Sequence, residues 1–385
     1  VAGGRLGVFL QYSGDILKRG TYSGSVYQPE FSNLYADIDL SEKYDNFVLR
    51  ALYAKALTNK FKLGGEVSLS HVKEMNELAR VSYYSDMSVS NETVNQPAGA
   101  NFSYLYAYML PRDSRYWETN LKASLETNLD PVKLDFSVFG GFIFDGDDKY
   151  DWRNGGNYLN QDGNIKGSKF GGELWLRLPV DDTLSIPLLL KAVYSKKTHR
   201  GDGFGNQGFT GSYDGSDRSK YFEFGAGLDK KFGKGGFATG LYYSFLDTQA
   251  TLDYATSDGG HYYYAPYPNL TEKRLTLKFA GEADVSSKFS LNGGLAFYYG
   301  WIDQQFTRDS SSYGLEDISN NGDIWGIGAS LGATVKLNGF TIEPYAKAGY
   351  SKLRLTGDGV TFYPLSSSDY KKNQWNVGGG FALRF

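Results

Sequence analysis

Residues 374–385 read QWNVGGGFALRF and decide the fold that we expect for the whole chain. Taken in steps of two, one set of positions is apolar, aromatic or glycine: Trp375, Val377, Gly379, Phe381, Leu383 and Phe385. The positions between them are small, polar or charged. Successive side chains of a β-strand point to opposite faces. The stretch therefore predicts a strand with one apolar face and one polar face.

The composition of the chain fits an all-β protein and excludes several other classes. The 385 residues include 48 Gly, 31 Tyr and 25 Phe, but no Cys, which excludes disulfides, thiolate metal sites and thiol nucleophiles. A formal net charge of −3 is too balanced for a dedicated nucleic-acid-binding protein, so we expect no nucleic-acid partner. No run approaches the roughly 18 consecutive apolar residues that a membrane-spanning helix needs.

The alternation of the last stretch recurs along the chain. Short turns, such as Asn338-Gly339, alternate with long polar segments, and each strand keeps one apolar face with aromatic residues near its ends. Such long strands are unusual in soluble sheets, and a propeller would need four short strands in each unit. The expected strands are residues 5–12, 47–57, 61–71, 117–127, 132–144, 170–180, 184–194, 222–232, 237–245, 274–285, 289–301, 325–337, 340–350 and 375–385.

This pattern resembles that of Gram-negative outer-membrane β-barrel proteins of the porin-like kind. In that class, a C-terminal Gly, a hydrophobic residue and a final aromatic are read by the assembly machinery, and the matching positions are Gly380, Leu383 and Phe385. The resemblance implies a single transmembrane antiparallel up-and-down β-barrel over residues 1–385, located in the bacterial outer membrane. It also implies outer-membrane lipid, lipopolysaccharide and the assembly machinery as partners. Short turns would be periplasmic and long loops extracellular.

The first third of the chain leaves a choice between about fourteen strands and sixteen. Residues 34–40 alternate weakly, and counting them as a transmembrane strand would require a further strand within residues 73–115 to keep the number even. We expect an extracellular extension or a loop-borne hairpin in both places, and so fourteen strands, with residues 375–385 pairing with residues 5–12. No signal peptide precedes the first strand, as expected for the mature form of an exported protein. Long extracellular loops are expected at about residues 13–44, 73–115, 145–168, 196–219, 247–269, 309–321 and 357–370.

The polar face of each strand points into a barrel, so the sequence also predicts the residues that line its lumen. Fourteen strands enclose more space than side chains fill, so we expect a pore, or a pore plugged by residues 13–44 or 73–115. Inward charges of both signs nearly cancel, which predicts weak charge selectivity in a channel, or paired structural networks. The predicted lumen-lining residues are Arg5, Arg50, Lys62, Glu66, Glu118, Lys122, Glu126, Lys133, Asp135, Glu173, Arg177, Lys191, Glu223, Asp229, Arg274, Lys278, Glu282, Glu343, Lys347 and Arg384.

Little in the sequence indicates enzymatic chemistry. A hydrolase at the membrane rim would need a His next to an acid or a Ser in a family signature. The three histidines, His71, His199 and His261, lie in no such signature, and we expect them to be rim and loop residues. We therefore expect no enzymatic activity and no cofactor.

Two loop segments are candidate binding sites. Asp145, Asp147, Asp148 and Asp151 form an oxygen-rich run that is a weak calcium candidate, but the spacing lacks a closing glutamate, so we expect a solvated acidic loop and no metal. The second segment is rich in tyrosine, and such clusters recognise sugars or proteins, or pack loops together as a lid. Its residues are His261, Tyr262, Tyr263, Tyr264 and Tyr267.

Three functions follow from this reading. The first is a monomeric or oligomeric outer-membrane channel for passive diffusion of small polar solutes. The second is a non-conducting barrel that serves as a surface anchor or binds a surface protein partner or ligand through its Tyr-rich outer loops. The third is an autotransporter-type translocator domain, which would carry a helix through its lumen, although residues 1–4 leave no room for one before the first strand.

Overall fold

In the computed structural model, the chain forms one antiparallel sheet that closes into a barrel. The structure describes residues 4–26, 34–85, 88–94, 112–154, 157–205, 210–256, 261–263, 269–310, 314–357 and 365–385. Its strands are β1 Arg5–Val26, β2 Leu34–Ala56, β3 Phe61–Ser85, β4 Ser88–Val94, β5 Arg112–Leu129, β6 Val132–Asn154, β7 Asn157–Pro179, β8 Leu184–Gly205, β9 Thr210–Phe232, β10 Gly235–Thr256, β11 His261–Tyr263, β12 Asn269–Ser286, β13 Phe289–Ser310, β14 Gly314–Leu337, β15 Phe340–Gly357 and β16 Leu365–Arg384.

Fourteen of these strands make the wall, while β4 pairs only with β3 and β11 pairs with β10. Each wall strand is antiparallel to its neighbours, and β16 closes the barrel against β1. At this seam Phe381 lies opposite Leu10, and the Phe385 N–H donates to the Leu6 carbonyl oxygen at 3.0 Å. The predicted fourteen-strand barrel and the pairing of the last strand with the first are confirmed.

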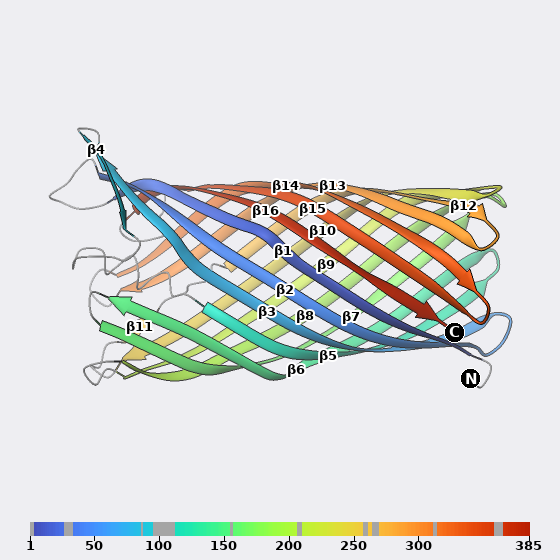
Figure 1. The fold of residues 1–385 in the computed structure, drawn as a ribbon, viewed down its shortest axis with the longest axis horizontal. Helices are drawn as coiled ribbons and strands as arrows, with labels where there is room; N and C mark the ends of the chain where they lie inside the picture. The colour runs from blue at the N-terminus through green and yellow to red at the C-terminus, as the bar shows by residue number, and fades with distance from the viewer. Residues whose placement is uncertain are drawn as a thin grey trace.

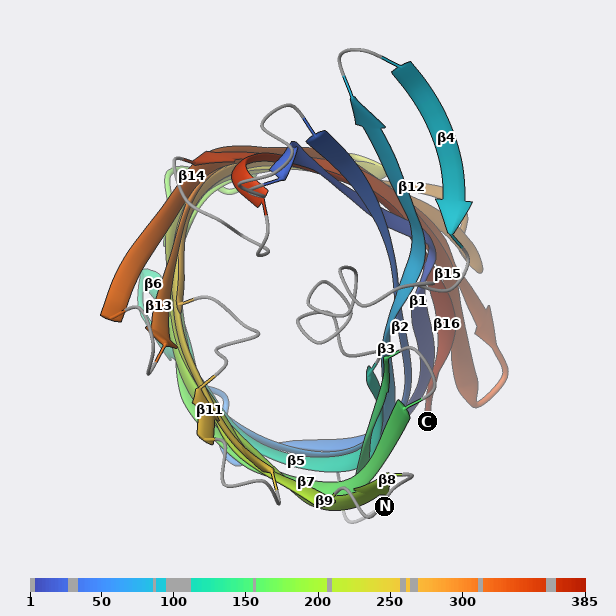
Figure 2. The ribbon, with the colours of Figure 1, turned by 90° about the vertical axis from the view of Figure 1, so that its left-hand side faces the viewer.

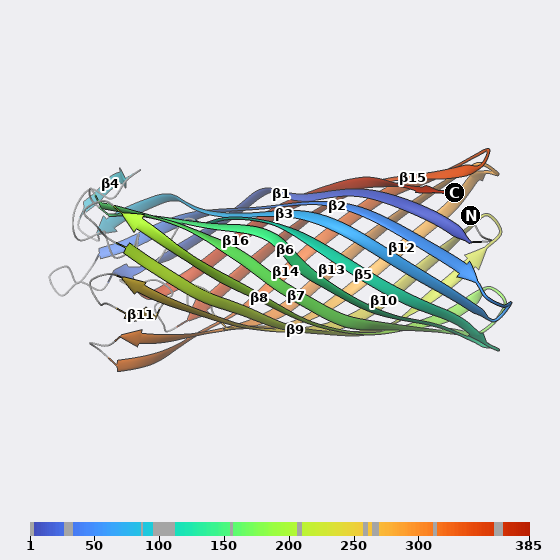
Figure 3. The ribbon, with the colours of Figure 1, turned by 90° about the horizontal axis from the view of Figure 1, so that it is seen from below.

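The two ends of the barrel differ. In Figure 1 the strands run obliquely along the cylinder, with both termini at one end and β4 and β11 at the other. Figure 2 looks along the barrel from the β4 end and shows a closed ring of strands, with β4 leaning away from the wall. The view from below in Figure 3 places both termini again at the short-turn end.

The short turns lie where the sequence predicts them. The β14–β15 turn consists of Asn338 and Gly339, and Gly339 has a φ of 94°, a left-handed conformation that glycine adopts without steric cost. In the β7–β8 turn, Asp181 Oδ1 accepts hydrogen bonds from the Thr183 and Leu184 N–H groups, both at 2.7 Å. These local contacts fix the hairpin connections at the terminus-bearing end.

The outward face of the barrel carries a belt of exposed apolar side chains. Alternate residues on each strand contribute, as Leu291, Leu295 and Trp301 do on β13. Because a soluble protein rarely exposes a contiguous apolar surface of this extent, the belt marks the part of the wall that faces lipid. We call it the membrane belt, and its members include Tyr12, Phe47, Leu69, Leu121, Val138, Phe170, Leu190, Phe224, Leu241, Leu277, Leu295, Leu331 and Phe381.

Aromatic side chains mark the border of the membrane belt that lies away from the short turns. Trp325 and Trp375 both contact Tyr350 there, with ring centroids 5.5 and 4.7 Å apart. The next outward positions are polar, such as Asp323 before Trp325 and Asp303 after Trp301. Aromatic rings followed by charged residues are typical of a membrane–water interface. The described residues include no helix long and apolar enough to cross a membrane.

The strands continue far beyond this aromatic border, and the prediction of long loops there is wrong for most of the residues. β13 and β14, for example, pair from Phe289↔Val335 to Ser310↔Gly314, which includes most of predicted loop 309–321. Residues 34–40 are the outer part of β2, as the extension alternative predicted. Outside the lipid the outward face is polar, so the apolar alternation stops while the backbone ladder continues. We call these strand parts the outer extensions; they fill most of predicted loops 13–44, 145–168 and 196–219, and parts of 73–115, 247–269 and 357–370.

Candidate functional site

The inner face of the barrel is the candidate functional site. All twenty predicted lumen residues occupy strand positions that alternate with the membrane belt, so their side chains lie on the inner face. Residues paired in register share a face, and Glu66↔Lys122 and Glu173↔Lys191 are such inward pairs. The structure thus places these charges around one interior, while their part in solute passage stays a prediction.

Many of these charges pair with one another. Arg50 Nε lies 3.5 Å from Glu66 Oε1, and Lys62 Nζ lies 2.7 Å from Glu126 Oε1. Even so, half of the Lys62 side chain remains exposed to solvent. The other pairs among the predicted residues are Lys191–Glu173 at 4.0 Å, Arg177–Asp229 at 3.4 Å, Lys278–Glu223 at 3.6 Å and Arg384–Glu343 at 2.8 Å.

Some predicted residues are not brought together in this way. Within the described part of the chain, Arg5, Lys122, Lys133 and Lys347 form no salt bridge, and neither do Asp135 and Glu282. Glu118 instead pairs with Lys169, and Arg274 pairs with Glu272. Lys169 and Glu272 lie on the inner face near the aromatic border, just outside the strands expected from the apolar alternation, which begin at residues 170 and 274.

Tyrosine rings lie flat on the inner wall beside several of these cations. A Cβ atom on Gly225 would come within 2.3 Å of the Tyr242 ring, so the ring covers the glycine of the neighbouring strand. Lys278 Nζ lies 4.2 Å from the centroid of the same ring. Tyr298 covers Gly326 in the same manner, under the Arg274 guanidinium at 4.3 Å. The small residues of the inner face thus make room for rings that in turn hold cations.

The interior changes character at and above the aromatic border, where two apolar clusters occupy the inner face. The strands that carry them lie apart in the sheet order, with β16, β1 and β2 between β15 and β3. The β3–β7 cluster consists of buried Val72, Tyr116, Ile143 and Ile165, with Tyr44 packed against them. The β12–β15 cluster consists of buried Ile302 and Leu355, together with Leu270, Ile324 and Leu353.

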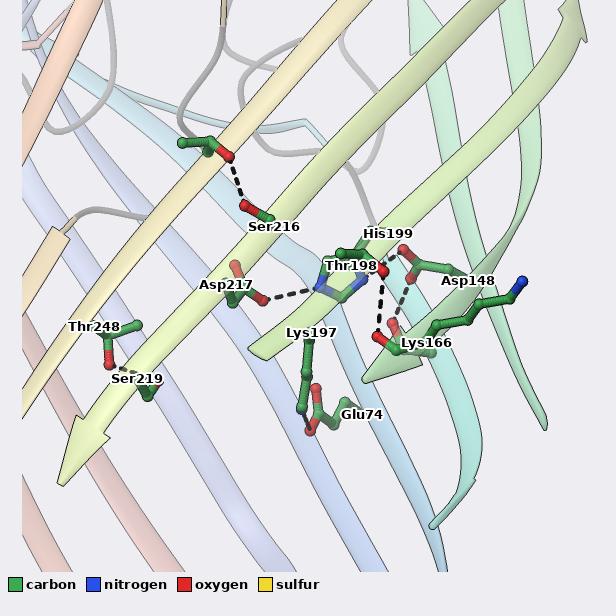
Figure 4. A network of polar contacts seen from close by, with 12 residues as sticks. Glu74, Asp148, Lys166, Lys197, Thr198, His199, Ser216, Asp217, Ser219 and Thr248 are labelled. Carbon is green, nitrogen blue, oxygen red and sulfur yellow. Dashed lines mark hydrogen bonds and ion pairs between the residues drawn. The ribbon is translucent and has the colours of Figure 1, made fainter. Parts of the chain in front are cut away.

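A buried polar network lies beside the β3–β7 cluster, in the outer extensions of β5, β6, β8 and β9 (Figure 4). The Ser114 hydroxyl donates to Asp148 Oδ1 at 2.5 Å, and both residues are fully buried. His199 Nδ1 lies 3.3 Å from Asp148 Oδ2, and its Nε2 lies 2.9 Å from Asp217 Oδ2. An imidazolium at this position would donate to both carboxylates at once.

The network contains Ser, His and Asp side chains, but their hydrogen bonds do not connect them as in the catalytic triad of a hydrolase. A hydrolytic serine gives its proton to the histidine, whereas the Ser114 hydroxyl donates to Asp148 and both ring nitrogens of His199 face carboxylates. The expectation that His199 is a rim or loop residue is wrong, because it is 4 % exposed within β8. His71, in contrast, lies on the outer face at the aromatic border, where its ring is 4.8 Å from that of Trp117.

The weak calcium candidate is not assembled. Asp148 points inward and is buried, whereas Asp145 and Asp147 are exposed on the other face; the Asp151 side chain lies outside the described residues. Opposite faces of one strand cannot converge on a single ion. Among the residues that the structure describes, no group of three or more His, Asp or Glu side chains is arranged to hold a metal ion.

The two remaining predicted sites lie at opposite ends of the barrel. His261, Tyr262 and Tyr263 form β11, their side chains are not described, and Tyr264 and Tyr267 lie outside the described residues. Gly380, Leu383 and Phe385 lie at the seam, where the Phe385 ring is 6.2 Å from that of Phe340. Ligand recognition by the first site and the assembly role of the second stay predictions.

The outer network was missed because residues 196–219 were assigned to a loop. A weaker signal was present in the sequence. From Tyr213 to Ser219 the alternate residues are Tyr, Gly, Asp and Ser, and the residues between them are charged or polar. The burial of β9 alternates through this segment, as it does in the membrane belt. Period-two alternation between small or buried polar residues and exposed charged residues could have indicated a strand in water.

Comparisons with known proteins agree on the architecture. No protein-family model matches the sequence, and no curated protein matches it. Among solved structures, the P. putida toluene transporter TodX matches with a TM-score of 0.53 at 9% sequence identity, covering 100% of this chain and 90% of TodX. The deltaS2 mutant of the TodX monoaromatic hydrocarbon channel matches with a TM-score of 0.54 at 10% identity, covering 99% of this chain and 90% of that one.

At this level of identity the likeness shows the fold. The chain has the fold of an outer-membrane β-barrel, closed by fourteen strands and surrounded by the membrane belt. Closed barrels with a lipid-facing apolar belt, short turns at one end and longer connections at the other are characteristic of the bacterial outer membrane. The location of this barrel is therefore the bacterial outer membrane.

Proposed function

We propose that this barrel is an outer-membrane channel through which small polar solutes diffuse passively. The observation that carries the proposal is the state of the inward charges at belt level. The Arg177 and Lys278 side chains are 50% and 48% exposed although each is paired with an acid. Charged groups keep that much contact with solvent only where water reaches them. A wet inner face inside a lipid-facing wall is what a diffusion channel requires.

The same pairs support weak charge selectivity. A strongly selective pore carries a ring of charges of one sign. Here Lys62, Arg177 and Lys278 each have an acidic partner within 4 Å, so the field that a passing ion meets is largely cancelled. Small neutral solutes and ions of either sign would pass under this proposal.

Single-channel recording of the purified protein in a planar bilayer tests the proposal. A channel gives stable steps whose conductance rises in proportion to salt concentration, and liposomes that contain it swell in small sugars. Protein that keeps its folded mobility on a gel yet gives neither signal would contradict the channel function. That result would favour the second reading, a non-conducting barrel that binds a surface partner through its outer end.

A second candidate solute class is small and apolar. The observation that favours it is the pair of apolar clusters on the inner face at and above the aromatic border, around Ile165 and around Ile302. The structures with a similar fold include a toluene transporter and a monoaromatic hydrocarbon channel. Uptake of radiolabelled toluene by cells with and without the barrel separates the two classes. If toluene enters faster with the barrel and small sugars cause no swelling, the channel carries small apolar solutes and the proposal of polar solutes is wrong.

A further inference from the structure

Lys197 on β8 makes contacts with distant strands that a flat sheet would not allow. Its Nζ donates to the Tyr116 hydroxyl at 2.9 Å and lies 3.3 Å from Glu74 Oε1, and the Tyr116 hydroxyl donates to the same carboxylate at 3.0 Å. Tyr116 is on β5 and Glu74 is on β3. The three side chains form a closed triangle, which we call the Lys197 bridge.

The bridge crosses the inside of the barrel. From β3 to β8 the wall makes four strand-to-strand steps, through β5, β6 and β7. With strands about 4.8 Å apart, this is about 19 Å of wall. A lysine and a glutamate cannot meet over that distance along a flat sheet. The wall must therefore curve sharply here, and the two side chains span the hollow of the curve.

Other contacts in the same sector also skip strands. The Tyr213 hydroxyl on β9 donates to the Asp148 carbonyl oxygen on β6 at 3.1 Å, and His199 on β8 reaches the Asp148 carboxylate. Lys169 on β7 pairs with Glu118 on β5. Side chains thus occupy the inner side of the wall from β3 to β9 at and above the aromatic border, and they narrow the interior there.

The charge on the bridge faces both the network and the interior. Burial and the neighbouring Glu74 raise the pKa of the Tyr116 phenol, so its hydroxyl remains a hydrogen-bond donor. Asp217 lies opposite Lys197 in the β8–β9 register, and the Lys197 and Glu74 side chains each keep about a third of their surface exposed. Lys197 is therefore a cation that pairs with Glu74 and lies beside Asp217 on this side of the interior.

We propose that Lys197 is a specificity-determining residue of the channel: the Lys197 bridge narrows the outer interior on the β3–β8 side, and its ammonium sets the ratio of cations to anions that pass. The proposal rests on the proposed channel function. Solutes that enter from outside meet this bridge above the bilayer, before the paired charges at belt level. Exchange of this cation for an acid leaves three carboxylates together, which attract cations and repel anions.

The test is the reversal potential of single channels in a salt gradient, compared between Lys197→Glu and Lys166→Glu. Lys166 lies on β7 beside the network, but its side chain points away from it on the exposed outer face (Figure 4). Both variants therefore change the net charge equally at a similar level. The Lys197→Glu variant is expected to raise the ratio of cation to anion permeability by about twofold or more, because the local charge changes by two and acts on a passing ion across about one Debye length. Lys166→Glu should stay at the wild-type ratio.

Two further variants separate the width of the bridge from its charge. Lys197→Ala removes the bridging side chain and should raise conductance. Lys197→Glu combined with Glu74→Lys restores an ion pair of reversed direction and should return selectivity toward the wild type. Folding of each variant is checked by its gel mobility without heating. If the wild type conducts and all Lys197 variants have the same conductance and reversal potential as Lys166→Glu, the bridge proposal is overturned. If the folded wild type does not conduct, the proposed channel function is itself wrong.

Discussion

The membrane belt and the outer extensions belong to the same strands, but opposite faces of the strands are shielded from water. At belt level lipid covers the outward face, and in the outer extensions side chains pack on the inward face. On β13, Leu295 and Trp301 are 47% and 48% exposed on the outer face at belt level. One position beyond Trp301, the inward Ile302 is 5% exposed, and the next outward residue is Asp303. The hydrogen-bonded ladder to β14 continues through both regions. The apolar alternation in the sequence therefore reports contact with lipid rather than the length of the strand.

The inner face differs between the two regions in a complementary way. At belt level it carries ion pairs that remain in contact with water, such as Lys62–Glu126. In the outer extensions it carries Asp148 and Ser114 without exposed surface. Lipid covers the outside of the belt, so the inside can stay wet. The outer extensions have water outside, and their stable packing must come from side chains inside.

The largest expected effect comes from a charge on the lipid-facing side of the belt. Leu295→Arg is expected to destabilise the barrel by about 2–4 kcal/mol, because it places a cation near the middle of the bilayer. Asp303→Arg, on the same face of the same strand beyond Trp301, should change stability little. Urea unfolding in lipid vesicles measures both. Equal stability losses would mean that the belt does not end at Trp301.

A smaller effect is expected from the buried network, and adjacent residues provide the control. Asp148→Ala leaves the Ser114 hydroxyl and His199 Nδ1 without their carboxylate, at a cost of about 1–3 kcal/mol. Asp147→Ala removes an exposed carboxylate from the other face of β6 and should be nearly neutral. Thermal unfolding in detergent compares the two variants. A neutral Asp148→Ala would show that the outer extensions do not depend on inward packing.

The smallest effect concerns the short-turn end. Hydrogen bonds from the Thr183 hydroxyl and from the Thr183 and Leu184 N–H groups lower the pKa of Asp181 from 3.8 to about 2. A lowered pKa means that the turn is stabilised fully above pH about 4, and that this contribution is lost as pH falls through about 2. The NMR shifts of the two amide protons should titrate near pH 2 and be flat in Asp181→Asn. Titration near pH 4 would refute these hydrogen bonds.

The sequence was sufficient for the parts of the molecule that lipid and local turns determine. Alternation located the membrane-spanning segments, turn residues such as Asn338-Gly339 located the hairpins, and the even strand number paired residues 375–385 with residues 5–12 at the seam. These features depend on period two, on local conformation and on closure, all of which can be read along the chain. The charged residues of the inner face followed from the same alternation.

The outer network could not be predicted in the same way. His199 meets Asp148 across an intervening strand, and Lys197 meets Glu74 across three. Such contacts depend on the local curvature of the wall, which leaves no spacing rule in the sequence. The polar outer faces beyond Trp301 and Trp325 also removed the apolar signal that marks a strand. The calcium candidate failed for a related reason, since residues adjacent along a strand point apart.

The most direct test of the account is a scan of β13 with an environment-sensitive fluorophore attached to single cysteines, which the cysteine-free chain permits without background. The outward positions Leu295, Tyr299, Asp303 and Gln305 are labelled one at a time in vesicles. We predict apolar emission at Leu295, an intermediate value at Tyr299 next to the aromatic border, and water-like emission at Asp303 and Gln305. Apolar emission at all four positions, or water-like emission at Leu295, would contradict a lipid boundary at Trp301.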